Sequence, residues 1–220
     1  MSTAVTSARP ADAGFLRARL GSVLAIAPLG VWTLVHLWNN LAAFKGASEW
    51  EHAVTEYDHP IGFFFSSVIA LLPLGLHTVW GIGRLFTTKP NNGRYLYFQN
   101  WKYLLQRLSA LGVLAFLGAH LWLAMLQPRL MKHRPEPFSD ISHEMATHLP
   151  TLVVYLLGTL GVAYHLANGI HTFTMGWGLV SSRSALKRLE KVIVVLFLVF
   201  LGMSWGAIYA LYSAGSSAGS

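Results

Sequence analysis

Four histidines lie inside four successive apolar stretches of the chain: His36, His77, His120 and His165, spaced by 41, 43 and 45 residues. A titratable side chain within hydrocarbon is costly and rare, and it usually marks a functional site. Neutral imidazole is a good axial ligand for haem iron, and burial favours the neutral form. One histidine on each of four consecutive helices therefore predicts a ligand that all four serve, and a pair of b-type haems fits this pattern best.

The composition indicates a membrane protein, because 54% of the residues are hydrophobic and only 11% are charged. The chain has no cysteine, which excludes an iron–sulfur cluster, a covalently attached c-type haem, a thiolate zinc site and a disulfide within it. Any redox cofactor must therefore be held by histidine. The net charge of +7 reports membrane topology, and we expect no nucleic-acid partner because no basic patch is interleaved with exposed aromatic residues.

Five apolar stretches are long enough to cross about 30 Å of hydrocarbon as helices. They cover residues 21–44, 61–86, 105–127, 150–178 and 192–212. We expect an all-α integral membrane fold in which residues 1–212 form one transmembrane cytochrome domain. Four helices should form a haem-binding bundle, with the fifth, 192–212, packed outside it. Residues 213–220 contain only Ser, Gly and Ala, and we expect them to form a disordered tail.

Basic residues predict the orientation, because lysine and arginine are retained on the cytoplasmic side of the membrane. The N-terminus and the second and fourth connections hold twelve of the sixteen: Arg9, Arg17, Arg19, Arg84, Lys89, Arg94, Lys102, Arg107, Arg183, Lys187, Arg188 and Lys191. Most acidic residues fall in the other two connections. The N-terminus is therefore expected in the cytoplasm and the C-terminus outside, in a multi-pass protein of a prokaryotic cytoplasmic membrane.

This orientation converts the histidine positions into depths. His36 lies about 15 residues beyond the cytoplasmic start of the first span, and His120 about 13 beyond Arg107, so both are roughly 20 Å from the cytoplasmic edge. Counted from the external ends of their spans, His77 and His165 lie in the inner half. The sequence thus predicts two pairs of histidines at two depths.

A weak internal repeat matches these two depths. The segment His36-Leu37-Trp38 recurs as His120-Leu121-Trp122, and both inner histidines are followed four residues later by Gly-Ile. Those glycines, Gly81 and Gly169, lie one helical turn from the histidines, where a missing Cβ leaves room for a flat macrocycle. We therefore include them among the expected cofactor-binding residues.

The chain resembles the diheme cytochrome b membrane-anchor subunit of succinate:quinone oxidoreductases, of the single-chain, five-helix type. Three segments carry the resemblance over nearly all of residues 15–212. They are the segment ending in His36, the stretch 101–109 (WKYLLQRLS) that leads to His120, and the stretch 164–170 (YHLANGI) followed by Trp177-Gly178.

The resemblance implies that His77 and His165 are the axial ligands of a proximal haem b, and that His36 and His120 hold a distal one. It further implies two partners, a flavoprotein subunit with FAD and an iron–sulfur subunit, docked on the basic cytoplasmic side. Arg107 could there reach a haem propionate. Electrons from succinate oxidation would pass through this chain to a quinone, making it the electron-transfer and quinone-reducing subunit of an enzyme rather than its flavin-bearing catalytic subunit.

A distal haem in the outer half would place the quinone pocket near the external surface. The candidate proton-exchanging groups there are Glu49, Glu56, Asp58 and His59, around the start of the second span. Some fumarate-reducing relatives carry a glutamate two residues before the fourth-span ligand, where this chain has Ala163. We therefore expect succinate oxidation with menaquinone.

Two alternatives come from other classes of protein. One is a diheme cytochrome b anchor of a hydrogenase or formate dehydrogenase. The other is a haem-free transporter whose histidines relay protons or bind a metal. The second is disfavoured because the spans contain no aspartate or glutamate at their centres and no broken-helix repeat.

Overall fold

The computed structural model describes residues 13–56, 60–87 and 97–218, and every regular element in these ranges is a helix. The α-helices are α1 (Ala13–Leu24), α2 (Val31–Asn40), α3 (Ala47–Val54), α4 (Pro60–Thr87), α5 (Phe98–Leu121), α6 (Gln127–Met131), α7 (Phe138–Thr147), α8 (Leu149–Gly176) and α9 (Arg183–Ala218). Three further helical segments join them: the π-helices η1 (Ala25–Gly30) and η3 (Trp122–Leu126) and the 3₁₀ helix η2 (Leu41–Lys45). The all-α fold class is thus confirmed.

Five continuous helical stretches are long and apolar enough to cross a membrane, as predicted: Arg19–Lys45, Ile61–Thr87, Asn100–Met131, Leu149–Gly176 and Arg183–Ala218. The third and fifth extend well beyond the predicted bounds. Hydropathy marks only the part of a helix that lies in hydrocarbon, whereas residues 183–191 (RSALKRLEK) are strong helix formers that continue the helix into the polar region. The fifth therefore begins nine residues earlier than its apolar stretch.

Proline residues account for the irregular segments of two spans. Pro28 lies within η1 and has no N–H to donate, so the first span widens into a π-helix between α1 and α2. In the third span, η3 follows His120 after one residue, and Pro128 occupies the start of α6. Both irregular segments change which side chains face the interior in the turns that follow.

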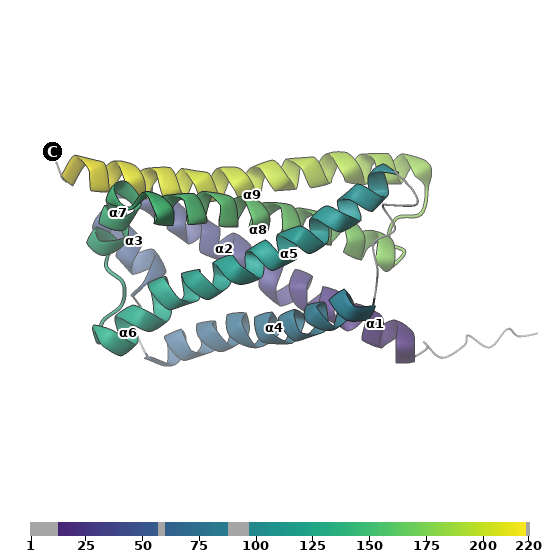
Figure 1. Ribbon diagram of the computed structural model, residues 1–220, viewed down its shortest axis with the longest axis horizontal. Helices are drawn as coiled ribbons and strands as arrows, with labels where there is room; N and C mark the ends of the chain where they lie inside the picture. The colour runs from purple at the N-terminus through teal and green to yellow at the C-terminus, as the bar shows by residue number, and fades with distance from the viewer. Residues whose placement is uncertain (1–12, 57–59, 88–96, 219–220) are drawn as a thin grey trace, which may run out of the picture.

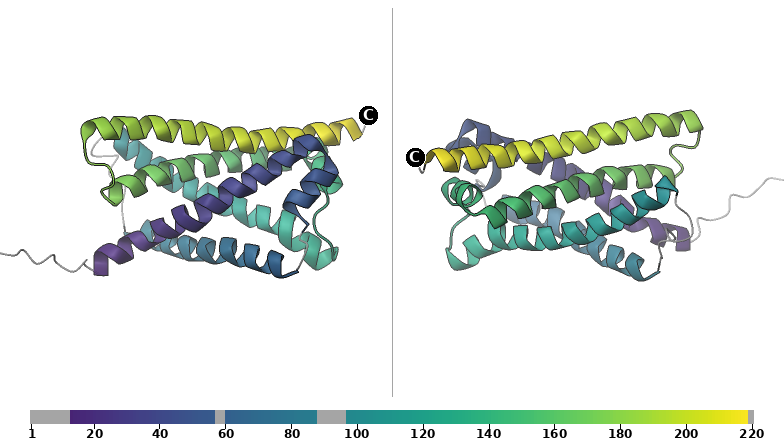
Figure 2. Two further views of the ribbon diagram at one scale, coloured as in Figure 1. Left: turned by 180° about the vertical axis from the view of Figure 1, so that it is seen from behind. Right: turned by 45° about the horizontal axis from the view of Figure 1, so that its top comes forward.

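The spans are arranged with α9 along α8 on one flank and α4 beside α1 on the opposite flank (Figures 1 and 2). The short helices α3, α6 and α7 gather at one end, which we call the α7 end (Figure 1). The start of α1, the start of α5 and the α8–α9 connection lie at the other, the α1 end (Figure 1). Each span therefore runs from one end to the other.

The best-packed core lies at the α7 end, where the short helices bury their apolar faces against α8 and α9. It comprises Ala43, Trp50, Phe116, Phe138, Ile141, Met145, Tyr155, Ile208, Ala210 and Leu211. Large apolar side chains elsewhere along the spans are exposed, such as Val79 at 72% and Leu198 at 57%. Apolar side chains that point outward along a span face lipid in a membrane protein, so their exposure agrees with five spans.

The expectation of a disordered tail from residue 213 was wrong, because α9 continues as helix through Ala218. Gly215 is buried, and a Cβ built on it would overlap the backbone carbonyl of Ser142 in α7. Ala214 packs against the core at the same end. Small residues allow two helices to approach closely, so this Ser-Gly-Ala segment forms a helix interface that composition alone did not reveal.

The Gly215→Ala variant should therefore lower the free energy of unfolding by about 1–3 kcal/mol, because the added methyl group meets immobile backbone. Gly202→Ala is the matched control: it lies on the same helix, and a Cβ there meets nothing within 4 Å. The control should be neutral or stabilising by up to about 1 kcal/mol. Denaturation in detergent micelles measures both, and equal stabilities would contradict the interface.

Candidate functional site

The four intramembrane histidines face one another in two pairs. The ring centroids of His36 on α2 and His120 on α5 are 6.0 Å apart. Those of His77 on α4 and His165 on α8 are 6.3 Å apart. Each pair therefore joins helices that are far apart in sequence, and the two pairs lie at different depths along the bundle.

Both separations suit a single metal ion bound between two imidazoles. Bonds of about 2.0 Å from each nitrogen to the metal, plus about 1.2 Å from nitrogen to ring centre, put the centroids roughly 6.4 Å apart. Within residues 13–56, 60–87 and 97–218, no three His, Asp or Glu side chains gather around one point. Two histidines on opposite faces are what a haem iron takes from a protein, since the porphyrin supplies the other ligands.

The second ring nitrogen of His77 has a defined partner. Its Nδ1 lies 2.8 Å from the carbonyl oxygen of Gly21 in α1. A carbonyl can only accept, so Nδ1 carries the proton and Nε2 keeps its lone pair for a metal. A Cβ on Gly21 would overlap the Trp80 ring, so glycine is needed at this point for α1 to approach α4.

His165 is held by a polar network between α5 and α8. Gln106 donates from Nε2 to the His165 carbonyl at 3.1 Å and accepts from Asn168 at 2.8 Å. Ser109 donates to the Gln106 carbonyl at 3.0 Å, and Nδ1 of His165 lies 3.3 Å from the Ser109 hydroxyl and 3.2 Å from Nε2 of Gln106. These contacts hold the Nδ1 side of the His165 ring and do not involve its Nε2.

The other pair has comparable support. Nδ1 of His120 lies 3.1 Å from the Tyr155 hydroxyl of α8. The His36 ring stacks on Trp32, with centroids 4.7 Å apart. Asn40 donates to the His36 carbonyl at 2.8 Å and accepts from the Trp50 indole at 3.3 Å, which ties this histidine to α3. The rotamers of both rings are therefore restricted by their neighbours.

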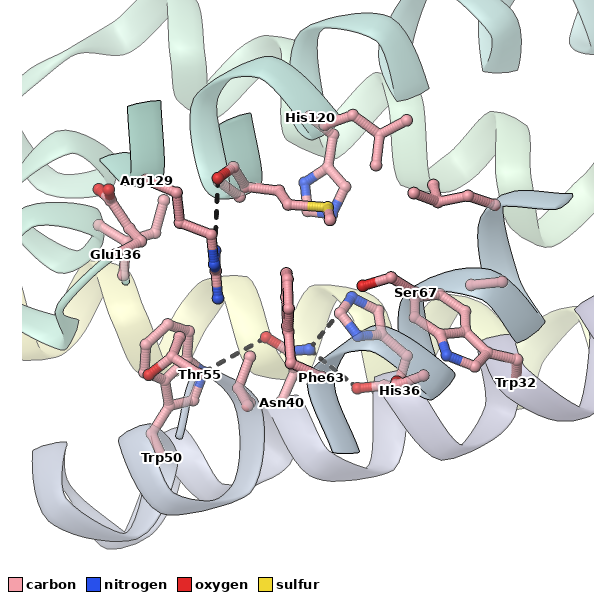
Figure 3. Close-up of a pocket in the computed structure, with 18 of the residues that line it drawn as sticks. Trp32, His36, Asn40, Trp50, Thr55, Phe63, Ser67, His120, Arg129 and Glu136 are labelled. Atoms are coloured by element: carbon pink, nitrogen blue, oxygen red, sulfur yellow. Dashed lines mark hydrogen bonds between the residues drawn. The ribbon is translucent and has the colours of Figure 1, made fainter. Parts of the chain in front are cut away.

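A cavity opens between His36 and His120 (Figure 3), and Trp50, Thr55 and Glu136 line it toward the α7 end. Its walls are mostly apolar. The polar groups labelled in Figure 3 include Asn40, Thr55, Ser67, Arg129 and Glu136. The cavity therefore combines an apolar body with a polar outer end, as a site for an amphipathic flat ligand requires.

The sequence of the chain matches known proteins. A profile described as "Succinate dehydrogenase/Fumarate reductase transmembrane subunit" matches residues 88–203, which is more than half of the chain. This chain belongs to that family. The transmembrane subunit is also similar to the succinate dehydrogenase cytochrome b558 subunit of Bacillus subtilis (strain 168), with 29% identity over 197 residues. The alignment covers 89% of this chain and 94% of that relative.

The remaining residues singled out from the sequence of this transmembrane subunit lie in different surroundings. A Cβ on Gly81 would meet nothing within 4 Å, and one on Gly169 would lie 3.8 Å from the Gln106 amide. Close packing of the described residues therefore requires glycine at neither position. Arg107 donates to the Arg84 carbonyl at 2.8 Å, which links α5 to α4 at the α1 end.

The acidic candidates around the second span do not line the cavity. Glu49 and Glu56 are exposed to solvent, and Asp58 and His59 lie outside the residues that the structure describes. The carboxyl group that does line the cavity is Glu136, in the connection before α7. Sequence reasoning missed Glu136, Arg129 and Tyr155, because nothing in their local sequence shows which way they point.

Glu136 in this connection and Asp140 in α7 have pKa values displaced in opposite directions. Partial burial raises the pKa of Glu136, reinforced by Asp140 and Glu144 and opposed by Lys132 and Arg134. Burial alone would also raise the pKa of Asp140. Its hydrogen bond with Lys132, at 3.0 Å, and the charge of Arg134, at 2.9 Å, nevertheless hold that pKa below its usual range. The cavity-lining carboxyl group is therefore the more easily protonated of the two.

The raised pKa of Glu136 and the lowered pKa of Asp140 predict opposite effects of pH on the stability of the transmembrane subunit. Folded Glu136 binds its proton more tightly than the unfolded chain, so its contribution falls as pH rises from 4.5 through the raised pKa. Folded Asp140 binds its proton less tightly, so its contribution is present above pH 3.8 and is lost below it. Glu136→Gln should remove the first dependence and Asp140→Asn the second. Thermal unfolding in detergent between pH 3 and 7 tests this, and parallel profiles for the two variants would contradict it.

Proposed function

We propose that this chain is the cytochrome b subunit of a succinate:quinone oxidoreductase and carries electrons through two b haems. The observation that carries the proposal is the pair of facing imidazole couples, with centroids 6.0 and 6.3 Å apart. His77 and His165 would bind the proximal haem, and His36 and His120 the distal one. The name of the Bacillus subtilis relative, a succinate dehydrogenase cytochrome b558 subunit, supports a haem-binding role.

Each haem, when bound, supplies reversible one-electron exchange. The protein's contribution is to fix the ligands and to exclude water. The Gly21 carbonyl, the Ser109 hydroxyl and the Tyr155 hydroxyl lie 2.8, 3.3 and 3.1 Å from an Nδ1 nitrogen, so each would accept the Nδ1 proton of a ring that binds iron through Nε2. Gly81 and Gly169, one helical turn from His77 and His165, would leave room for a flat macrocycle.

The orientation proposed is N-terminus in the cytoplasm and C-terminus outside, in a prokaryotic cytoplasmic membrane. Among the described residues, the α1 end carries a cluster of basic side chains: Arg19, Arg84, Lys102, Arg107, Arg183, Lys187, Arg188 and Lys191. Retention of such residues on the cytoplasmic side supports this orientation. The flavoprotein subunit with FAD and the iron–sulfur subunit would dock there, nearest the proximal pair.

Quinone would exchange electrons at the opposite, external end, close to the distal pair. Reduction of a quinone consumes two electrons and two protons, so the site needs a group that can pass protons. Glu136 takes this role in place of the exposed Glu49 and Glu56, because it lines the cavity and its pKa is raised.

We propose menaquinone as the quinone and succinate oxidation as the direction, on the basis of Ala163 at the position of the fumarate reductase glutamate. The family match does not favour a hydrogenase or formate dehydrogenase anchor, nor a haem-free transporter.

Replacing His120 with Ala should remove one of the two haems and leave the other, because each iron then depends on a separate pair. His165→Ala should remove the other haem. The matched control is His143→Ala, an exposed histidine on α7, which should keep both. Haem per polypeptide, measured as the pyridine complex of the purified chain, decides the outcome. A wild-type chain purified without haem from haem-producing cells would refute the proposal.

Replacing Tyr155 with Phe should raise the midpoint potential of one haem by a few tens of millivolts, where about 59 mV is a tenfold change of a one-electron equilibrium. With His120 bound to iron through Nε2, the hydroxyl would accept the Nδ1 proton and make the ring a stronger donor to oxidised iron. Tyr209→Phe, at an exposed site on α9, is the control. A potentiometric titration followed by absorbance separates the two haems, and equal shifts in both would argue against this assignment.

A further inference from the structure

Arg129 is a cationic side chain that reaches the cavity from a membrane-spanning helix. It lies at the outer end of the third span, in α6, and is partly buried. Its guanidinium carbon lies 4.5 Å from the centre of the Phe63 ring of α4. Its Nη1 donates to the Met125 carbonyl at 3.3 Å. These contacts hold the guanidinium in the polar outer end of the cavity, on the same side as Glu136 (Figure 3).

The π-helical segment η3 explains why Arg129 points this way. In a regular α-helix, nine residues turn by about 900°, so Arg129 would lie opposite His120. The wider turn of η3 contains one additional residue. It therefore rotates the residues that follow by about 100° around the helix axis, relative to a regular α-helix. His120 and Arg129 then lie within about a quarter turn of each other, and both line the same cavity.

The charge of Arg129 indicates the chemistry of its ligand. Of the described residues that line the cavity, Arg129 is the one with a permanent positive charge. The planar guanidinium fits a carboxylate, which it can bind through two parallel hydrogen bonds.

We propose that Arg129 binds a carboxylate of the macrocycle held between His36 and His120, and so positions the distal haem. This inference rests on the proposed haem function. A haem b has an apolar body and a carboxylate-bearing edge. The cavity has the matching arrangement, with the two imidazoles in its middle, apolar walls around them and the guanidinium at its outer end. Arg129 therefore sets the direction of the carboxylate edge, toward the α7 end.

A positive charge at this edge also favours the reduced state of the bound haem, because it stabilises the added electron. Arg129→Gln should therefore shift the midpoint potential of one haem to more negative values, opposite to the shift expected for Tyr155→Phe. Arg129→Lys keeps the charge but loses the two parallel hydrogen bonds, so it should shift the same haem less. Arg134→Gln is the control, because Arg134 is paired with Asp140 at 2.9 Å and is not among the residues that line the cavity.

The experiment is a potentiometric titration of the haem-loaded chain, with the affected transition assigned by its absence in His120→Ala. A shift, or loss of only that haem, in Arg129→Gln and a smaller change in Arg129→Lys support the proposal. Unchanged potentials in Arg129→Gln, or a shift of the other haem, overturn it while leaving the two-haem function intact. Weaker binding of a quinone analogue with unchanged potentials also overturns it and assigns Arg129 to the quinone. A wild-type chain without haem would instead refute the proposed function itself.

Discussion

Two pairs of imidazoles that face each other at about 6 Å, each from helices distant in the sequence, are the arrangement on which the proposed function depends. It fixes how far α2 stands from α5 and α4 from α8. Hydrocarbon offers no water to the second ring nitrogen, so a protein group must satisfy it. The Gly21 carbonyl does this for His77 only because α1 approaches α4 closely, and the Tyr155 hydroxyl does it for His120 only because α8 lies beside α5. The positions of α1 and α8 thus supply the partners that these two rings need.

The π-helical segments η1 and η3 change the direction in which the side chains that follow them point. A regular α-helix repeats its faces every 3.6 residues, so two groups nine residues apart cannot serve one cavity. The segment η3 breaks this repeat directly after His120 and brings Arg129 to the same cavity. Pro28 produces a similar widening in the first span, before the turns that carry Trp32 and His36. π-Helical segments are frequent at functional sites for this reason.

The two ends of the bundle differ in chemistry. At the α7 end, amphipathic helices close over a hydrophobic core, and the Phe138 N–H donates to Glu51 at 2.7 Å, which ties α7 to α3. At the α1 end, basic residues such as Arg84 and Arg107 dominate. A subunit that takes electrons from a docked partner on one side and delivers them to a lipid-soluble carrier on the other needs this asymmetry. The proposed function therefore uses one end for protein docking and the other for exchange with the membrane.

The sequence by itself determined the five spans and the two depths of the histidines, because hydropathy and a rise of 1.5 Å per residue depend only on local residues. It also predicted a cofactor-binding role for Gly81 and Gly169, one helical turn from His77 and His165. The tertiary structure decided what depends on distant segments. It formed a helix interface from the Ser-Gly-Ala tail, since Gly215 meets Ser142 of α7. It also brought Arg129 and Glu136 to the cavity, where a π-helical segment and a connection, neither visible in the residue pattern, set their directions.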